Sequence, residues 1–292
     1  MARWLGGREL LGHKEDIRLR HLAVVIGDNC IDRYVEPINK SFVGGNAVNV
    51  AVAMHRKGIS VSYIGVVGTD PEGQWILSAL KAEGIDVSRV QIIEGSTAFT
   101  DIALQNGDRI ILKEEPGVID KFTLSRDAIE FIGKQELVHN TVLGRREDYI
   151  PSFKAGGAAI SFDYSETKGE NIFNSCFPYV DIAFVSMPEA DMKSAEEYAR
   201  YLTGKGLRLA VITINAKGSL AFDGKRMWRQ IAIETNNLVD TLGAGDSFIG
   251  TFLADWIKGL PLNLILGDAA IMASKTCGHF GGWLPSYKGD ER

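Results

Sequence analysis

Apolar runs of strand length alternate along this chain with segments of helical periodicity. The runs include LAVVIG, VSYIGVVG, AAISFDYS and LRLAVITI. Strands without polar alternation are typical of a sheet buried on both faces, and helices between successive strands favour parallel pairing. The sequence therefore predicts an α/β fold in which helices cover both faces of a mostly parallel sheet.

The segments between these runs have recognisable helix boundaries. In NAVNVAVAMHRKG, apolar residues recur at Ala47, Val50, Ala51 and Met54, and Lys57-Gly58 ends the pattern. In PEGQWILSALKAEG, Pro71 suits a first helical turn and Gly84 a helix end. A third helix is expected in EADMKSAEEYARYLTGKG.

One segment breaks this alternation. TAFTDIALQNGDRIILKEE has strand-like halves on either side of Asn106-Gly107, the pair best suited to a tight hairpin turn. Two strands without an intervening helix indicate a small sheet that projects from the α/β body. An ordinary hairpin at a sheet edge is the alternative.

Composition excludes several classes of protein. The 292 residues are 45% hydrophobic, with a formal net charge of -5 and no basic cluster, which argues against a nucleic-acid partner. Cys30, Cys176 and Cys277 have neither disulfide-framework nor zinc-site spacing, so a reducing cytoplasm is the simplest location. No apolar run is long enough for a membrane span, and residues 1–20 are interpreted as an N-terminal extension of uncertain role.

The stretch VDTLGAGDSFIGTF places small residues directly before an amphipathic helix. Backbone N–H groups at a helix N-terminus attract anions, and Gly243, Ala244 and Gly245 have no bulky side chains to keep a phosphate away. Asp246 has two interpretations. It is either the N-cap of the helix or a base directed at a group beside the bound anion.

The string DTLGAGDSF resembles the signature of the ribokinase-like, PfkB-type sugar kinases, and other landmarks of that family follow in order from about His21 to Trp283. The resemblance implies a ribokinase-like three-layer α/β/α core over residues 21–292, with a small β-sheet lid formed by segments near 33–43 and 91–115. It also implies ATP and Mg²⁺ as cofactors, and Asp246 as the base that activates a primary hydroxyl of a sugar.

Two neighbouring elements, GDNCID and GGNAVNVA, look like the sugar-binding part of that family. The resemblance assigns sugar contacts to Asp32 and to Asn46 or Asn49, and Gly44-Gly45 would let the backbone approach the ring. Asp28, in the same turn, is an additional candidate. The alternative for Gly44-Gly45-Asn46 is a plain helix start.

Two further motifs match the family in part. VSMPEAD lies where the family carries Asn-x-x-Glu; Glu189 is carried over as a water-mediated Mg²⁺ residue, whereas Ser186 departs from the pattern. A capping box is the alternative. VITINAKGS resembles the nucleotide-binding strand, so Thr213, Asn215 and Gly218 are expected near ATP, although Asn215 replaces a glycine. Its alternative is a simple strand-to-hairpin turn.

Asp240 belongs to the family signature as a structural residue and, in several members, as a ligand of a monovalent cation such as K⁺. The segment AIMASKTCGHFGGW lies where the family closes its adenine pocket. His55, His139 and His279 lack metal-ligand spacing.

Within the family, the motifs look closest to fructoselysine 6-kinases. The substrate would then carry an ammonium group, and charged residues of the hairpin are candidates to bind the amino-acid part: Glu94, Asp101, Arg109, Glu114 and Glu115. A kinase for fructose, ribose, ketodeoxygluconate or a nucleoside is the alternative, as is a non-catalytic sensor of sugar or nucleotide. A homodimer formed through the lid is also expected.

Overall fold

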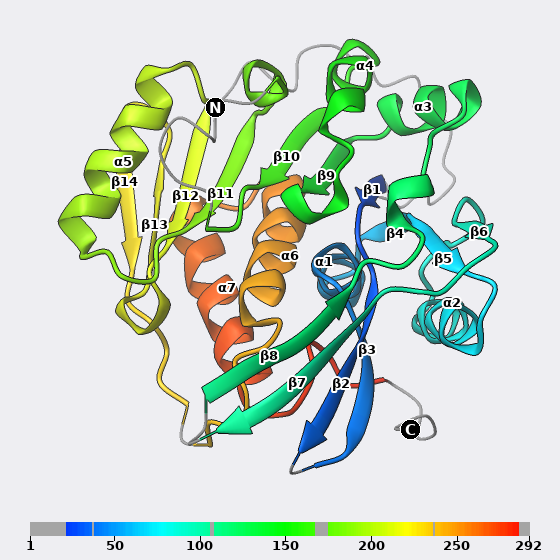
Figure 1. The fold of residues 1–292 in the computed structure, drawn as a ribbon. Coiled ribbons are helices and arrows are strands. Elements are labelled where there is room, and N and C mark those ends of the chain that lie inside the picture. The colour runs from blue at the N-terminus through cyan, green and yellow to red at the C-terminus, as the bar shows by residue number, and fades with distance from the viewer. Residues whose placement is uncertain (1–21, 37, 106–107, 167–174, 236, 286–292) are drawn as a thin grey trace, which may run out of the picture.

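An eight-stranded sheet forms the centre of the molecule (Figure 1). The computed structural model describes residues 22–285 except 37, 106–107, 167–174 and 236. In order across the sheet, the strands are β14 (Met227–Gln230), β13 (Ser219–Phe222), β12 (Leu209–Thr213), β11 (Ile182–Ser186), β10 (Ala159–Asp163), β9 (Leu137–Thr141), β1 (Leu22–Ile26) and β4 (Ser60–Ile64). All pairs from β12 to β4 are parallel, which confirms the predicted α/β fold.

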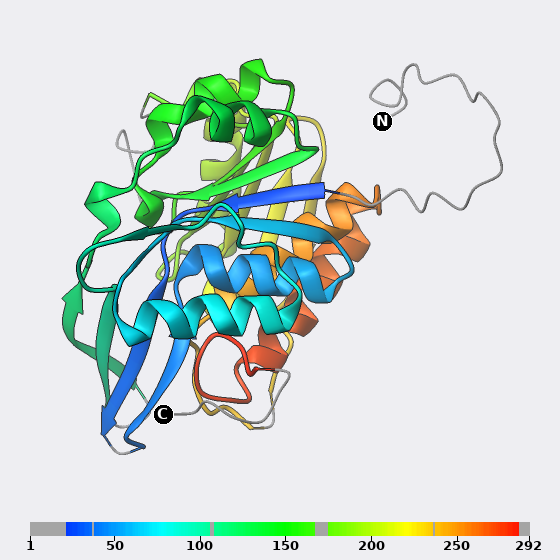
Figure 2. The same cartoon turned by 90° about the vertical axis from the view of Figure 1, so that its right-hand side faces the viewer.

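Helices cover both faces of this sheet (Figure 2). One face packs against α1 (Asn46–Arg56), α2 (Pro71–Glu83), α6 (Ala244–Ile257) and α7 (Leu262–Thr276). The other packs against α3 (Arg126–Gly133), α4 (Ile150–Ala155) and α5 (Met192–Gly204). Short 3₁₀ turns cover Ile119–Lys121, Val142–Gly144, Glu147–Tyr149, Phe177–Tyr179 and Asn215–Lys217. The two apolar cores complete the three layers that the alternating pattern predicts.

The helix boundaries follow the sequence signals. α2 has Asp70 as its N-cap, Pro71 in its first turn and Gly84 in a left-handed conformation at its end, as predicted. The N-cap of α5 is Asp191, whose side chain accepts a hydrogen bond from the Ser194 amide at 2.7 Å. The capping-box alternative for Ser186-x-x-Glu189 is therefore wrong.

A second sheet projects from this body (Figures 1 and 2). Its strands, in the order β3-β2-β7-β8, are β3 (Lys40–Gly44), β2 (Cys30–Glu36), β7 (Phe99–Gln105) and β8 (Asp108–Glu115). We call it the lid sheet. β7 and β8 pair as the expected hairpin, whose turn at 106–107 lies outside the described residues. Because the hairpin pairs with β2 and not with the central sheet, the edge-hairpin alternative is wrong.

One boundary of the lid segments and one apolar run differ from expectation. β6 (Gln91–Ile93) pairs with β5 (Val66–Gly68) in a separate two-stranded sheet, so the second lid segment begins at Phe99 rather than near 91. The run VSYIGVVG also divides into β4 and β5 at Gly65, where a Cβ atom would lie 2.3 Å from the Tyr63 hydroxyl oxygen. An uninterrupted apolar run gives no sign of such a division.

The N-terminal extension, residues 1–20, lies outside the described residues. None of the helices that the structure describes is long and apolar enough to cross a membrane.

Candidate active site

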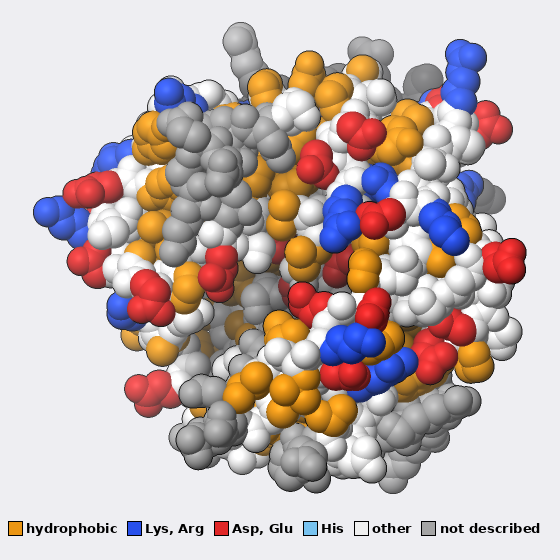
Figure 3. Space-filling model, viewed as in Figure 1, with side chains coloured by type: hydrophobic (Ala, Val, Ile, Leu, Met, Phe, Trp, Pro, Cys, Tyr) orange, Lys and Arg blue, Asp and Glu red, His pale blue; other side chains and the backbone are white. Residues whose placement is uncertain are grey.

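Polar side chains line the carboxyl ends of the parallel strands. Thr141, Asp163, Ser186 and Thr213 are the last residues of β9, β10, β11 and β12, and Asp28 follows β1. The register pairs Thr141 with Asp163 and Ser186 with Thr213. Open α/β sheets bind ligands at this edge of the sheet. Figure 3 shows a hollow above the lid sheet with acidic side chains along its border.

The N-terminus of α6 opens onto the same edge. Gly243 is its N-cap with a φ of 73°, and a Cβ atom there would lie 2.4 Å from the Gly282 Cα. Only glycine fits that position without strain. Gly245 is exposed, and a Cβ atom on it would have no atom within 4 Å. The first amides of α6 are therefore accessible to an anion, as the sequence predicts.

Asp246 is the third residue of α6 and is 9% exposed. One of its carboxylate oxygens accepts a hydrogen bond from the Asn49 side-chain amide of α1 at 2.7 Å. Because Gly243 is the N-cap and the Asp246 carboxylate is directed at α1, the N-cap interpretation of Asp246 is wrong. The Oδ1 atom of Asn49, also buried, has no hydrogen-bond partner among the described residues. It can accept a bond from a ligand hydroxyl.

Burial raises the pKa of Asp246 to about 8, although the hydrogen bond from Asn49 opposes the shift. The negative charges of Asp163, Asp28 and Asp32 raise this pKa further. A carboxylate with a raised pKa is a stronger base than one in water, and proton abstraction at neutral pH benefits from a base whose pKa is close to that pH.

Asp28 holds the beginning of α1. Its carboxylate accepts hydrogen bonds from the Asn46 amide at 2.7 Å, the Ala47 amide at 3.4 Å and the Thr141 hydroxyl at 3.0 Å. Burial raises the pKa of Asp28, and these hydrogen bonds oppose the rise. The alternative of a helix start at Gly44-Gly45-Asn46 is thus borne out, since Gly45 is the N-cap of α1. The helix that begins here nevertheless carries Asn49, whose side chain contacts the candidate base Asp246.

Asp32 lies on β2 of the lid sheet and is 4% exposed. Its carboxylate packs on Gly44, where a Cβ atom would lie 2.0 Å from the Asp32 Oδ2 atom. The Cys30 thiol donates to the other Asp32 oxygen at 3.2 Å, and burial raises the pKa of this thiol well above its usual value. Gly45 has a φ of 106° and a Cβ atom there would lie 2.5 Å from the Asn29 Cα. Gly45 is therefore required by close backbone packing, and Gly44 leaves room for the Asp32 carboxylate.

The candidate nucleotide residues lie on and after β12, two strands from β10 in the central sheet. Thr213 ends β12, and Asn215 follows with a φ of 49°, the left-handed conformation that its replacement of glycine requires. Gly218 has a φ of 107°, and a Cβ atom there would lie 2.1 Å from the Gln230 carbonyl oxygen. The turn therefore forms with Asn215 in place of the family's glycine, as expected. It also connects the antiparallel strands β12 and β13, so the simple strand-to-hairpin turn describes it equally well.

Glu189 and Asp240 have different surroundings. Glu189 is exposed, in the segment that follows β11. Asp240 is buried and accepts hydrogen bonds from the Leu242 amide at 3.1 Å and from the Tyr34 hydroxyl, which links β2 to the loop before α6. Burial and this contact raise the pKa of Tyr34. Within the described residues, no three His, Cys, Asp or Glu side chains are grouped to hold a metal ion.

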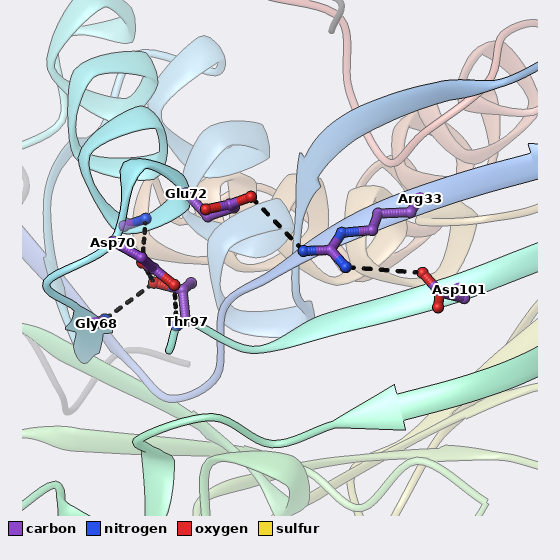
Figure 4. Close-up of polar contacts among 7 residues, drawn as sticks. Arg33, Gly68, Asp70, Glu72, Thr97 and Asp101 are labelled. Carbon is purple, nitrogen blue, oxygen red and sulfur yellow. Dashed lines mark hydrogen bonds and ion pairs between the residues drawn. The ribbon is translucent and has the colours of Figure 1, made fainter. Parts of the chain in front are cut away.

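The charged residues of the lid sheet divide between its two faces. The register places Glu114 opposite Thr100 and Thr100 opposite Asp32, so Glu114 shares the face that carries Asp32. Asp101 lies on the opposite face, where Arg33 bridges it to Glu72 of α2 with distances of 4.0 and 3.6 Å (Figure 4). Nothing is described of the Arg109 side chain.

The same figure shows why the base of the lid sheet is fixed relative to α2. Asp70 accepts hydrogen bonds from the Thr97 amide at 2.6 Å and from the Gly73 amide at 3.0 Å. The Thr97 hydroxyl in turn accepts one from the Gly68 amide at 2.9 Å. These hydrogen bonds and the ion pair between Arg33 and Glu72 connect the lid sheet to α2. Asp101, which pairs with Arg33, lies on that side of the lid sheet and not on the Asp32 face.

The sequence interpretation missed Asp163 and Thr141. Asp163 is buried at the carboxyl end of β10, and its charge is the first of the three that raise the pKa of Asp246. The signal was a carboxylate at the end of the apolar run AAISF, since such a residue reaches the ligand-binding edge of a parallel sheet.

Comparison with known proteins identifies the family. A model of the "pfkB family carbohydrate kinase" matches residues 36–286. The chain belongs to the PfkB family of carbohydrate kinases. It is therefore a phosphotransferase, an ATP-dependent sugar kinase.

Individual relatives agree with this assignment. The chain is 36% identical to a fructoselysine 6-kinase of Escherichia coli over 88% of its length and 98% of that protein. It is 32% identical to the fructosamine kinase FrlD of Bacillus subtilis over 90% and 93%.

Among solved structures, an Arabidopsis thaliana ribokinase complexed with ribose and ATP superposes with a TM-score of 0.77 at 21% identity, over 89% of this chain and 93% of that one. A Giardia lamblia ribokinase also gives 0.77, at 18% identity over 90% and 94%. These structures show the ribokinase-like fold.

Proposed function

We propose that this PfkB kinase transfers the γ-phosphoryl group of ATP to the 6-hydroxyl of a fructosamine, with fructoselysine as its preferred acceptor. The similarity to two fructosamine kinases over nearly the whole chain supports this substrate class. The carboxyl groups gathered at the site are the structural observation that carries it.

Several carboxyl groups gather at the site, and burial raises the pKa of Asp28, Asp163 and Asp246. Asp163 and Asp246 are buried and Asp28 is partly buried, and no ion pair between described residues involves any of them. Burying carboxylates without a counter-ion is costly, so a ligand that brings positive charge is favoured. The ammonium group of a fructosamine supplies such a charge, whereas fructose, ribose and adenosine do not. Glu114, on the Asp32 face of the lid sheet, adds a further negative charge near the hollow.

In the proposed reaction, Asp246 accepts the proton of the sugar hydroxyl as its oxygen bonds to the γ-phosphorus. The bond from that phosphorus to the bridging oxygen breaks, and ADP leaves. The amides from Gly243 to Gly245 stabilise the charge on the moving phosphoryl group, and Asp32 with Asn46 or Asn49 orients the sugar. Thr213, Asn215 and Gly218 bind the ATP phosphates.

Magnesium would neutralise the phosphate oxygens when it is bound with ATP. Mg²⁺ retains several waters and needs few protein ligands, so the single carboxylate of Glu189 fits a water-mediated contact. Asp240 remains a candidate ligand for K⁺, although its oxygens accept the Tyr34 and Leu242 hydrogen bonds. We also propose that the protein works in the cytoplasm, where its three cysteines, none of them in a disulfide between described residues, stay reduced.

ATP consumption against a panel of acceptors tests the substrate. With Mg²⁺ present, kcat/KM for fructoselysine is expected to exceed that for fructose by roughly 10- to 100-fold, because one hydrogen bond between charged groups contributes about 1.5–3 kcal/mol. Ribose, ketodeoxygluconate and adenosine complete the panel. Preference for one of these would reject the fructosamine assignment, and sugar binding without any turnover would favour the sensor alternative.

We further propose a homodimer formed through the lid sheet. Its edge strand β8 exposes Ile111 at 59% and Leu112 at 56%, and the register shift in this hairpin leaves Leu112 without a partner on β7. Exposed apolar edges favour pairing with another chain.

The variant Leu112→Asp is expected to turn a dimer into a monomer at micromolar concentration, measured by sedimentation velocity. Leu264→Asp is a matched control because Leu264 on α7 is 57% exposed. A wild-type protein that is monomeric under the same conditions would contradict the dimer.

A further inference from the structure

Asp163 is a buried carboxylate to which the reaction as described gives no role. It ends β10, is 6% exposed, and accepts a hydrogen bond from the Ser165 amide at 2.8 Å. Its other described polar partner is the Asn46 side chain of α1. Burial raises the pKa of Asp163 to about 6, the nearby charge of Asp28 adds to the rise, and the two hydrogen bonds oppose it.

The first turn of α1 connects Asp163 to the candidate base. Asp28 holds the backbone of Asn46, and Asp163 holds its side chain. Residues three apart lie on the same face of a helix, so Asn49 follows Asn46 on the side that faces α6. There the Asn49 amide donates to Asp246. A continuous chain of contacts thus runs from β10 through α1 to α6.

We propose that Asp163 is a positioning residue for phosphoryl transfer: it fixes Asn46 at the start of α1 and places a second buried carboxylate beside Asp246. This inference rests on the proposed role of Asp246 as the base. No separate ligand is required, because both effects act within the described side chains.

The electrostatic consequence has a definite sign. The charged groups that face Asp246 are Asp163 from β10, Asp28 from the loop after β1 and Asp32 from β2, and all three raise its pKa. The neighbouring helix α1 contributes the neutral Asn49. Removing the Asp163 charge therefore lowers the pKa of Asp246. A lower pKa extends activity to lower pH and makes the carboxylate a weaker base.

The variant Asp163→Asn tests this in the full-length protein. Asparagine keeps the size of the side chain and a hydrogen-bonding oxygen while removing the charge. The acid limb of the kcat/KM profile, measured with the best acceptor sugar, is expected to move to lower pH by about one unit. Asp163→Glu, which retains the charge, should keep the limb close to the wild-type position.

Asp181→Asn is the matched control. Asp181 is a buried carboxylate that also contacts β10, through the Ile160 amide at 2.8 Å, but it pairs with Lys154 and Arg208 away from the site. Its loss should weaken the fold and leave the acid limb in place. A folded Asp163→Asn protein with an unmoved acid limb would overturn the proposal.

A second measurement needs neither turnover nor a folded variant at position 163. In protein labelled with ¹³C at aspartate carboxyls, the Asp246 resonance is identified by its loss in Asp246→Asn. As the pH is varied, the chemical shift of this resonance should change in two steps, one of them near pH 6, where Asp163 titrates. A single-step titration would refute the coupling. Absence of kinase activity with every acceptor would instead reject the proposed function and leave this result unchanged.

Discussion

Asp246→Asn is expected to lower kcat by about 10²- to 10⁴-fold, the usual contribution of a general base. Asparagine keeps the shape and the contact with Asn49 but cannot accept the proton of the acceptor hydroxyl. Sugar and ATP binding, measured by calorimetry, should stay within a few-fold of wild type. Turnover at the wild-type rate would show that Asp246 is not the base.

The stability of the same variant provides a control with its own sign. The pKa of Asp246 rises from its ordinary value of 3.8 to about 8 in the folded protein because the carboxyl is buried. The folded state therefore holds this proton more tightly than the unfolded state, and wild-type stability falls as the pH rises through that interval. Asp246→Asn should lose this part of the pH dependence in denaturant unfolding. A variant less stable than wild type at pH 8 would point to a structural role.

The sequence predicted the fold class because its hydrophobic pattern, its helix caps and its turn residues all indicate the same elements. Apolar runs of strand length predict the buried strands. Pro71 predicts the start of α2, and the Asn106-Gly107 pair predicts the hairpin of β7 and β8. The helix that begins after Gly243 also followed from its small residues and apolar stripe. These features depend on residues close together in the chain.

Other parts depend on contacts that no local pattern records. Whether Asp246 caps its own helix or faces Asn49 is decided by the packing of α1 against α6. Which lid charges face the hollow is decided by strand register, and Asp101 differs from Glu114 for that reason alone. Asp163 acquires its importance only where β10 meets Asn46. Such relations arise from tertiary pairing, which spacing along one chain does not encode.

Asp32→Ala is expected to raise KM for the sugar by roughly 10²-fold or more while leaving KM for ATP nearly unchanged. Two hydrogen bonds from sugar hydroxyls to a carboxylate would each contribute about 1.5–3 kcal/mol. The two substrates should separate because Asp32 lies on the lid strand β2, whereas Thr213 and Gly218 lie at the far end of the central sheet. Equal losses for both would show that Asp32 only supports the fold.

Gly44→Ala tests the same contact without removing the carboxylate. Its added methyl group would lie 2.0 Å from the Asp32 Oδ2 atom, so the carboxylate must turn away. Sugar affinity should fall as in Asp32→Ala, and the double variant should be no worse than Asp32→Ala, since both changes disable one group. Gly204→Ala is the control, because no atom lies within 4 Å of a Cβ at that position. Additive losses in the double variant would mean that Gly44 serves the sugar through its own backbone, independently of Asp32.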